Sequence, residues 1–136
     1  MTPEFYSAAF ITILITMLTQ AAQVSVSVSR RKFGIPLPSV TGHIEFERFH
    51  RAHANQIERN VVFLPVLWLS SMAISWVFIL PLGLIWVILR AIFVRAYATD
   101  NKKLRMIGGI GDVVPTAILF VMTVLVLAAS FFGFRF

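Results

Sequence analysis

Residues 60–89 read NVVFLPVLWLSSMAISWVFILPLGLIWVIL and contain no charged side chain. One helical crossing of a bilayer needs about 20 apolar residues, and two crossings need about 40. This run falls between those lengths, and Pro81 and Gly83 interrupt it. We therefore predict two membrane-spanning helices, joined by a tight turn between Ile74 and Leu82, whose outer ends extend into charged residues.

Two further segments are long enough to cross a membrane. Residues 5–29 and residues 113–134 carry no charge, and each approaches or exceeds the length of one span. The first is followed by Arg30, Arg31 and Lys32 and has no basic residue before it, so we expect a span rather than a secretory signal. The sequence therefore predicts one domain over residues 1–136, an all-α bundle of four transmembrane helices, with spans at about 5–29, 57–75, 80–99 and 112–134.

The connections between the spans have their own signals. Residues 34–42 contain two prolines and two glycines and are predicted to form a loop. We expect Thr41 to cap the next helix, with Glu45 and Glu47 in its first turns, where the helix dipole favours acids. Residues 100–105 are predicted to form the polar connection before the last span.

The composition is that of a membrane protein. Hydrophobic residues make up 58% of the chain and charged residues 13%, whereas soluble domains have about 45–50% and about 25%. Cysteine is absent, which excludes a disulfide, a cysteine nucleophile and a cysteine–metal site. Any thiol chemistry must therefore use a thiol that the substrate brings.

Positive charge is concentrated at two of the predicted connections. All of the 12 lysine and arginine residues except Arg135 lie in or beside the first and third connections. Basic residues that flank apolar spans indicate membrane topology, so we do not expect the net charge of +6 to serve nucleic-acid binding. The positive-inside rule places both connections in the cytoplasm and both termini on the opposite side.

Polar residues at helical spacing mark two faces. On the second predicted helix, spacings of 3, 4 and 3 place four side chains on one face, in a row about 15 Å long: Arg48, Arg51, Asn55 and Glu58. A short peptide with two carboxylates and an amine would complement this row, and an intrahelical salt-bridge ladder, which a membrane boundary disfavours, is the alternative. On the first helix, a polar stripe is expected to face other helices rather than lipid: Thr16, Thr19, Gln20 and Gln23.

Other candidate residues lie near the same membrane boundary. Arg90, Phe93 and Tyr97 share one face of the third predicted helix, where an interfacial aromatic belt with a snorkelling arginine is the alternative to a site. Arg105 is equally consistent with a topology-setting charge. We predict no metal site at His50 and His53, which share a face but have no evident third ligand.

The segment from Glu45 to Glu58, Glu-Phe-Glu-Arg-x-x-Arg-Ala-His-x-Asn-x-x-Glu, resembles the signature of the MAPEG family, the membrane-associated proteins in eicosanoid and glutathione metabolism. Arg30-Arg31 before a proline loop, Thr41-Gly42, Arg90 and Tyr97-Ala98 extend this resemblance over nearly the whole chain. It implies a homotrimer that binds glutathione as co-substrate between neighbouring subunits, near the cytoplasmic face.

The resemblance also implies roles for individual residues. Arg51, Asn55 and Glu58 match family glutathione ligands, and Tyr97 matches a tyrosine at the site. Arg30 matches an arginine at the glycyl carboxylate of glutathione. Arg105 is the best match to the arginine beside the glutathione sulfur, and would be the catalytic residue. We add a supporting set: Arg48, His53, Arg90 and Phe93.

Two departures from the family pattern bear on the activity. Phe93 stands where several members have tyrosine, and Arg59 stands where the eicosanoid branch often has tyrosine. They favour a general detoxification enzyme over a leukotriene synthase. We therefore expect a membrane-bound glutathione transferase that activates the glutathione thiolate against hydrophobic electrophiles or lipid hydroperoxides. The alternative is a non-enzymatic, lipid-binding scaffold of the lipoxygenase-activating type. A small multidrug transporter is disfavoured because residues 5–29 contain no acid.

Overall fold

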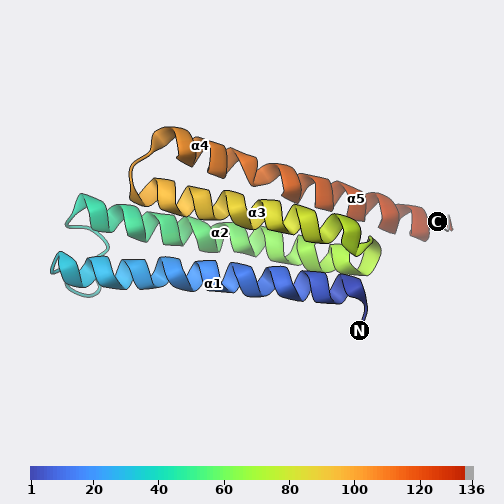
Figure 1. Ribbon diagram of the computed structural model, residues 1–136, viewed down its shortest axis with the longest axis horizontal. Helices are drawn as coiled ribbons and strands as arrows, with labels where there is room; N and C mark the ends of the chain where they lie inside the picture. Colours follow the sequence, from blue (N-terminus) through green and yellow to red (C-terminus); the bar gives the residue numbers. More distant parts are fainter. Residues whose placement is uncertain (134–136) are drawn as a thin grey trace.

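A computed structural model describes residues 1–133 of the chain (Figure 1). Those residues form helices joined by short connections and include no strand. The helices are α1 (Pro3–Lys32), α2 (Ile44–Ala73), α3 (Trp76–Ala98), α4 (Lys102–Gly111) and α5 (Val113–Phe131). Only Asp112 separates α4 from α5, so these two helices form one continuous fourth rod.

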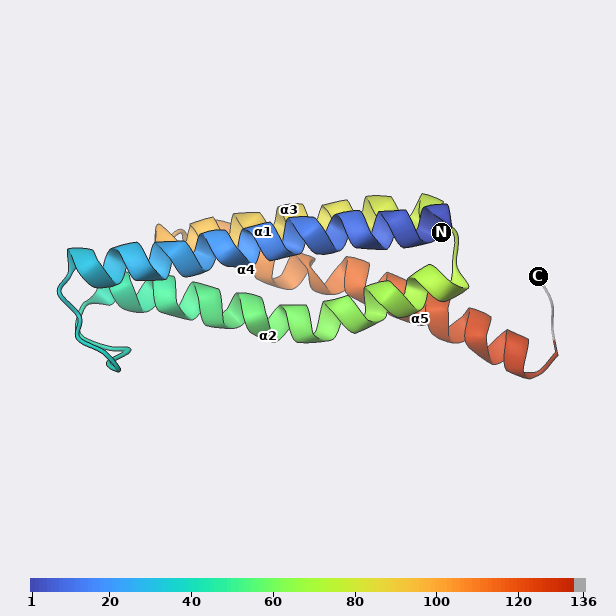
Figure 2. The same ribbon diagram turned by 90° about the horizontal axis from the view of Figure 1, so that it is seen from below.

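The four rods pack as a bundle with their long axes roughly aligned. Helices α1, α2 and α3 contact one another, α4 packs on α3, and α5 packs on α2 and α3 (Figures 1 and 2). Three of the rods are long and apolar enough to cross a membrane, namely Pro3–Lys32, Trp76–Ala98 and Lys102–Phe131. Helix α2 is as long as α1, at 30 residues, but its first half carries charged side chains. The predicted all-α, four-helix membrane bundle is confirmed.

The α1–α2 loop and the α3–α4 loop lie at the same end of the bundle. The loops at residues 33–43 and 99–101 are at the left of Figure 1, and the α2–α3 turn lies near the N-terminus at the other end. That turn consists of Ile74 and Ser75, at the start of the predicted interval. Pro81, which we expected to interrupt the run, lies inside α3 instead. A proline inside a helix removes one backbone hydrogen bond, and packing against neighbouring helices compensates for this loss.

Local capping differs from the sequence prediction at two helix starts. His43 caps α2 by accepting a hydrogen bond from the backbone N–H of Glu45, so the predicted Thr41 cap is wrong. Thr41 remains in the loop, where its carbonyl accepts a bond from the Ser39 hydroxyl. At α4, Asn101 caps the helix and α4 begins at Lys102, so the polar connection is shorter than predicted.

The last predicted span ends beyond the described part of the chain. Helix α5 ends at Phe131, and the prediction extended to Phe134. Phe134 lies outside the described residues. So does Arg135, which is the one basic residue away from the first and third connections.

The core of the bundle lies where α1, α2, α3 and α5 meet. Its fully buried aromatic pair, Phe63 and Trp86, stacks with ring centres 4.1 Å apart. Aliphatic side chains surround this pair: Ile11, Ile15, Leu67, Ile79 and Leu119. Gly83 lets α1 approach α3, because a Cβ there would lie 2.7 Å from the Ile11 side chain. Close-packed interiors leave no room for such an atom.

The packing of α4 on α3 depends on Gly108, which yields a first testable prediction. A Cβ at this position would lie 2.7 Å from the carbonyl oxygen of Leu89 and 2.8 Å from the backbone nitrogen of Phe93. Backbone cannot move aside as a side chain can, so Gly108→Ala is expected to lower the free energy of unfolding by about 3 kcal/mol, the upper end of overpacking costs. Thermal unfolding of the detergent-purified protein would measure this loss.

Gly109→Ala is the matched control for that measurement. A Cβ at Gly109 would meet only the Phe93 ring, at 3.0 Å, and this ring is a side chain that can shift. The control is expected to melt closer to the wild type. Equal melting temperatures for the two variants would contradict a backbone contact between α3 and α4.

Candidate functional site

The polar row predicted on α2 is present and exposed at its centre. The Arg51 Nη1 lies 3.7 Å from the Glu58 Oε1, with 60% and 55% of the two side chains exposed. Between them, the Asn55 amide nitrogen donates a hydrogen bond of 3.3 Å to Glu58 Oε2. The structure therefore brings these three predicted residues together in a ladder. An exposed ion pair of this kind stabilises a helix by less than about 1 kcal/mol, so it can open for a ligand at little cost.

Arg48, at the end of the same row, has a different partner. Its guanidinium pairs with Asp100 at 2.7 Å, which ties the start of α2 to the loop between α3 and α4. Asp100 adopts a left-handed backbone conformation, with φ of 56°. Arg48 is therefore held in an ion pair with Asp100 and does not join the exposed contacts among Arg51, Asn55 and Glu58.

Tyr97 lines two depressions at this end of the bundle. One, of about 420 Å³, is lined by Tyr97, Arg105, Phe93 and Gly109 among others. The other, of about 370 Å³, is lined by Tyr97, Arg51, Arg48 and Glu47 among others. The Arg105 guanidinium carbon stands 4.9 Å from the centre of the Tyr97 ring, a cation–π contact. Arg51 and Arg105 thus each line a depression that this tyrosine also lines.

Arg30, in the last turn of α1, lines neither of these two depressions. It donates hydrogen bonds to the backbone carbonyls of Ser39 at 2.7 Å and Pro36 at 3.2 Å. Its guanidinium carbon also stands 4.8 Å from the Phe46 ring centre. These contacts, both of the hydrogen bonds through Nη1, hold the loop at residues 33–43 against the end of α1.

His53 belongs to the same side as Arg30. A depression of about 470 Å³ is lined by both residues, together with Gln23 and Arg31. At 100° per residue, His53 points about 160° away from Arg51 around α2. Partial burial, and to a smaller extent the nearby His50, lower the pKa of His53. The predicted site residues therefore lie around two depressions, one beside Tyr97 and one beside Arg30, and His50 lines both.

Arg90 is fully buried, which the interfacial alternative did not predict. Its Nη1 donates to Asp112 Oδ2 at 3.0 Å, its Nε to Gln56 at 2.9 Å, and its Nη2 to Asn55 at 3.0 Å. The guanidinium carbon also stands 4.4 Å from the ring centre of Phe93, which is buried rather than part of a lipid-facing belt. Arg90 thus links α3 to α2 and to the junction of α4 and α5.

Sequence reasoning missed the partners of Arg90. Asp112 is 1% exposed and is the acid that balances the buried guanidinium. It stands directly before the last uncharged segment, and an acid at that depth could have been identified as the counter-ion that a membrane-embedded arginine requires. The network continues from Gln56 to Asn60 at 2.9 Å, and from Asn60 to Thr19 of α1, also at 2.9 Å.

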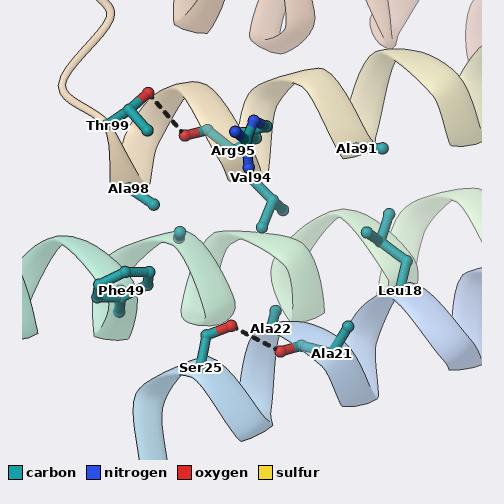
Figure 3. Close-up of a pocket in the computed structure, with 11 residues that line it drawn as sticks. Leu18, Ala21, Ala22, Ser25, Phe49, Ala91, Val94, Arg95, Ala98 and Thr99 are labelled. Carbon is teal, nitrogen blue, oxygen red and sulfur yellow. Dashed lines mark hydrogen bonds between the residues drawn. The ribbon is translucent and has the colours of Figure 1, made fainter. Parts of the chain in front are cut away.

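A separate groove between α1, α2 and α3 contains none of the predicted site residues (Figure 3). It has a volume of about 320 Å³, and five of its eleven lining residues are alanines. The two hydroxyl groups at its edge are already bonded to their own helices, Ser25 to the Ala21 carbonyl and Thr99 to the Arg95 carbonyl. Arg95 is the one charged residue that lines the groove, so its walls offer few groups for recognition of a polar ligand.

Comparison with known proteins identifies relatives of the chain. Residues 8–125 match the profile of the MAPEG family. An uncharacterised protein of Synechocystis sp. is 34% identical over 105 residues, which cover 77% of this chain and 76% of that protein. Leukotriene C4 synthase of Bos taurus is 31% identical over 103 residues, which cover 76% of this chain and 69% of the synthase.

A transferase is also among the relatives. Microsomal glutathione S-transferase 2 of Mus musculus is 37% identical over 75 residues, which cover 55% of this chain and 51% of the transferase. The match thus spans about half the length of that transferase. The family resemblance found in the sequence is confirmed over nearly the whole chain.

The Arg90–Asp112 pair generates a second prediction. Arg90→Met leaves the Asp112 carboxylate buried without its main partner, and loss of one member of a buried pair costs about 3–5 kcal/mol. We expect a loss of that size in the free energy of unfolding, measured by thermal unfolding in detergent. In the double variant Arg90→Met/Asp112→Leu, no buried charge remains unpaired, so most of the stability is expected to return.

The exposed pair of Arg48 and Asp100 serves as the control. Because both side chains are partly solvated, Arg48→Met is expected to cost at most about 1 kcal/mol. A double variant no more stable than Arg90→Met alone would show that the network does not hold α3 as described.

Proposed function

The chain belongs to the MAPEG family, and from that premise we propose that it is a membrane-bound glutathione transferase whose site is the surface around Tyr97. The observation that carries this proposal is that Arg51 and Arg105 each line a depression that Tyr97 also lines. A glutathione molecule there would meet a cation at each end and a carboxylate, Glu58, in the same row as Arg51.

The binding chemistry follows from the groups exposed in the row. The Arg51 guanidinium can form a bidentate pair with a glutathione carboxylate, and Glu58 can accept hydrogen bonds from the ammonium group. Both side chains are more than half exposed, and their mutual contact is long, at 3.7 Å. Glutathione would therefore replace a weak internal pair with two charge-assisted contacts. Asn55, held by Arg90, would keep Glu58 in position.

Arg105 is proposed to stabilise the glutathione thiolate. A free thiol has a pKa near 8.5 and is only a few per cent ionised at pH 7. Lowering that pKa by about two units corresponds to roughly 2.7 kcal/mol of preference for the thiolate. A guanidinium at a partly dry site supplies an effect of this order. Arg105 lies over the Tyr97 ring and has no carboxylate partner among residues 1–133, so its charge remains available to an anion.

The thiolate would react with a hydrophobic second substrate. In conjugation, its sulfur forms a bond to an electrophilic carbon while the leaving group departs with the electron pair of its own bond. With a lipid hydroperoxide, the sulfur attacks oxygen, the O–O bond breaks, and an alkoxide leaves. A second glutathione then reduces the resulting sulfenic acid to the disulfide and water. Both reactions use the same activated thiolate.

We further propose that the protein is a homotrimer that completes the site between subunits. Arg30 and His53 line a different depression from Arg51, and His53 points about 160° away from Arg51 around α2, which supports a site that takes the two sets from neighbouring copies. Gln20 and Gln23 are exposed on α1 within the predicted span, where a neighbouring subunit would shield them from lipid. In this assembly, the loops at residues 33–43 and 99–101 face the cytoplasm and the termini face the opposite side.

Arg105 provides the third prediction. In Arg105→Ala, the thiolate absorbance that appears when glutathione binds is expected to fall, and conjugation of a generic aromatic electrophile should fall at least tenfold. Arg105→Lys should recover part of both signals, since it keeps the charge. Stopped-flow absorbance and steady-state conjugation by the detergent-purified protein would measure these effects.

Arg95→Ala is the matched control, because Arg95 lies at the same end of the bundle but outside the proposed site. It should retain wild-type conjugation. An undiminished thiolate signal in Arg105→Ala would remove the role assigned to that residue. Absence of both conjugation and calorimetric glutathione binding in the wild type would instead favour a lipid-binding scaffold, with the Arg51–Glu58 ladder as a purely structural feature.

The fourth prediction tests the shared site. Homotrimers of Arg30→Ala and of Arg51→Ala should each bind glutathione poorly. When the two variants are co-expressed, some interfaces receive both intact arginines, and conjugation should return to a measurable fraction of wild type. Native mass spectrometry would establish the mixed assembly. If mixed oligomers form but have no more activity than either parent, the two arginines do not contribute to one site.

A further inference from the structure

The start of α4 carries Arg105 but is poorly held by packing. From Asn101 to Ile107, every residue except Arg105 is exposed, and the first buried residue of the helix is Gly108. Among the described helices, α4 packs on α3 and α5 and has no contact with α2. A turn of helix with so few buried side chains shifts and opens easily. Another interaction must therefore fix Arg105 relative to Arg51 on α2.

The loop before α4 has a backbone geometry that usually requires glycine. At the end of α3, the Asn101 N–H donates to the Ala96 carbonyl at 2.8 Å, and the Asp100 N–H donates to the Tyr97 carbonyl at 3.3 Å. This pair of bonds is the Schellman motif, in which the residue at the place of Asp100 is left-handed and is most often glycine. Asp100 adopts that conformation, with φ of 56°. A side chain there costs conformational energy, which a contact made by that side chain can offset.

The Asp100 carboxylate makes such a contact with Arg48. Its Oδ2 accepts from the Arg48 Nη2 at 2.7 Å, the shortest ion pair among residues 1–133. The two side chains are less exposed than those of Arg51 and Glu58, so solvent and salt weaken this pair less. Arg48 lies one helical turn before Arg51 on the same face of α2, and Asp100 directly precedes Asn101, the cap of α4. The pair therefore joins α2 to the start of α4.

The other end of α4 is joined to α2 through the buried network. Asp112, which follows α4, accepts from Arg90, and Arg90 donates to Gln56 of α2. Arg105 lies in the half of α4 nearer to Asp100, and its backbone N–H donates to the Asn101 carbonyl at 2.9 Å. Because only about 6 Å of helix separates Arg105 from that cap, a shift of the cap moves Arg105 with it.

We propose that the Arg48–Asp100 pair is a clamp that positions Arg105 relative to Arg51. This inference rests on the proposed function, in which Arg51 binds a carboxylate of glutathione and Arg105 stabilises the thiolate. A tripeptide extends to at most about 10 Å, so it can reach both cations only over a narrow range of separations. A displacement of about 1 Å between reacting groups can cost about a hundredfold in rate. Arg48 and Asp100 act through Arg105 and are therefore positioning residues.

The variant Asp100→Gly separates positioning from stability. Glycine adopts the left-handed conformation freely, so the turn is kept while the carboxylate is lost. The melting temperature in detergent should equal or exceed that of the wild type. At pH 6, kcat for conjugation of an aromatic electrophile should fall about tenfold, together with the thiolate absorbance of bound glutathione. The KM for glutathione should stay within about threefold of wild type, because Arg51 and Glu58 remain.

The pH profile of kcat shows whether Arg105 is the displaced group. Weaker stabilisation of the thiolate raises the pKa of the bound thiol, and one unit corresponds to about a tenfold loss of thiolate at a pH below both values. Above both values the thiol is ionised in either protein. The loss in Asp100→Gly should therefore shrink as the pH rises and be nearly absent at about pH 9. A variant with a generally weakened fold would lose activity at every pH.

Variants of Arg48 test whether the two side chains act as one unit. Arg48→Met should reproduce the loss in kcat, and its combination with Asp100→Gly should lose no more than either single variant. Arg48→Lys keeps the charge and should recover part of kcat. Lys32→Met is the matched control, because it breaks an exposed pair with Glu45 at the same end of the bundle that does not involve α4. It should keep the wild-type pH profile.

A distance measurement tests the clamp without glutathione. The chain has no cysteine, so spin labels at Glu45→Cys and Lys103→Cys report only on the starts of α2 and α4. Labelled chains would be diluted with unlabelled ones, so that distances within one chain dominate. Electron paramagnetic resonance of the detergent-purified protein should show a broader distance distribution after Asp100→Gly.

Three results would overturn the proposal. They are an unchanged distance distribution in Asp100→Gly, additive losses of kcat in the double variant, and a raised KM with unchanged kcat in Arg48→Met, which would mean that Arg48 binds glutathione directly. A wild type that neither binds nor conjugates glutathione would instead reject the proposed function and the role of the clamp in it. A distribution that still broadens in Asp100→Gly would distinguish that failure from the absence of a clamp.

Discussion

The bundle depends on one buried cation. Arg90 is fully buried inside a protein whose outer surface is apolar, and a guanidinium in that setting is stable only when its donors are satisfied. Its partners come from two directions, Gln56 and Asn55 on α2 and Asp112 at the junction of α4 and α5. Hydrogen bonds with strict geometry therefore fix the placement of α2 and of the fourth rod around α3, where lipid-facing apolar packing alone would permit sliding.

The same interaction positions the candidate site. Asn55 uses its oxygen to accept from Arg90 and its nitrogen to donate to Glu58, so the buried network sets the orientation of an exposed carboxylate. This arrangement explains why an amide stands between two charged residues in the row. A carboxylate in its place could accept from Arg90 but could not donate to Glu58, and an aliphatic residue would leave both neighbours without support.

The sequence predicted the parts of this structure that follow from local patterns. Uncharged runs identified the spans, and 3–4 spacing placed Arg51, Asn55 and Glu58 on one face. Prediction from the sequence failed where contacts between distant residues determine the position of a side chain. Spacing on α3 cannot show that Arg90 points at Asp112, 22 residues away at the junction of α4 and α5. Likewise, the choice of His43 over Thr41 as the cap depends on how the loop closes against Arg30, which no local propensity encodes.

The charges of the network do not cancel, and the network has a surplus of positive charge. Arg90 is balanced by Asp112, and Arg51 by Glu58. Arg59 reaches only the carboxylate oxygen that Arg90 already uses, and at the longer distance of 3.7 Å, so it contributes a positive charge without an acid of its own. Fields from such a surplus extend further in a low-dielectric bundle than in water. This end of the protein therefore carries a surplus of positive charge, and the thiolate stabilisation that we propose requires a surplus of that sign.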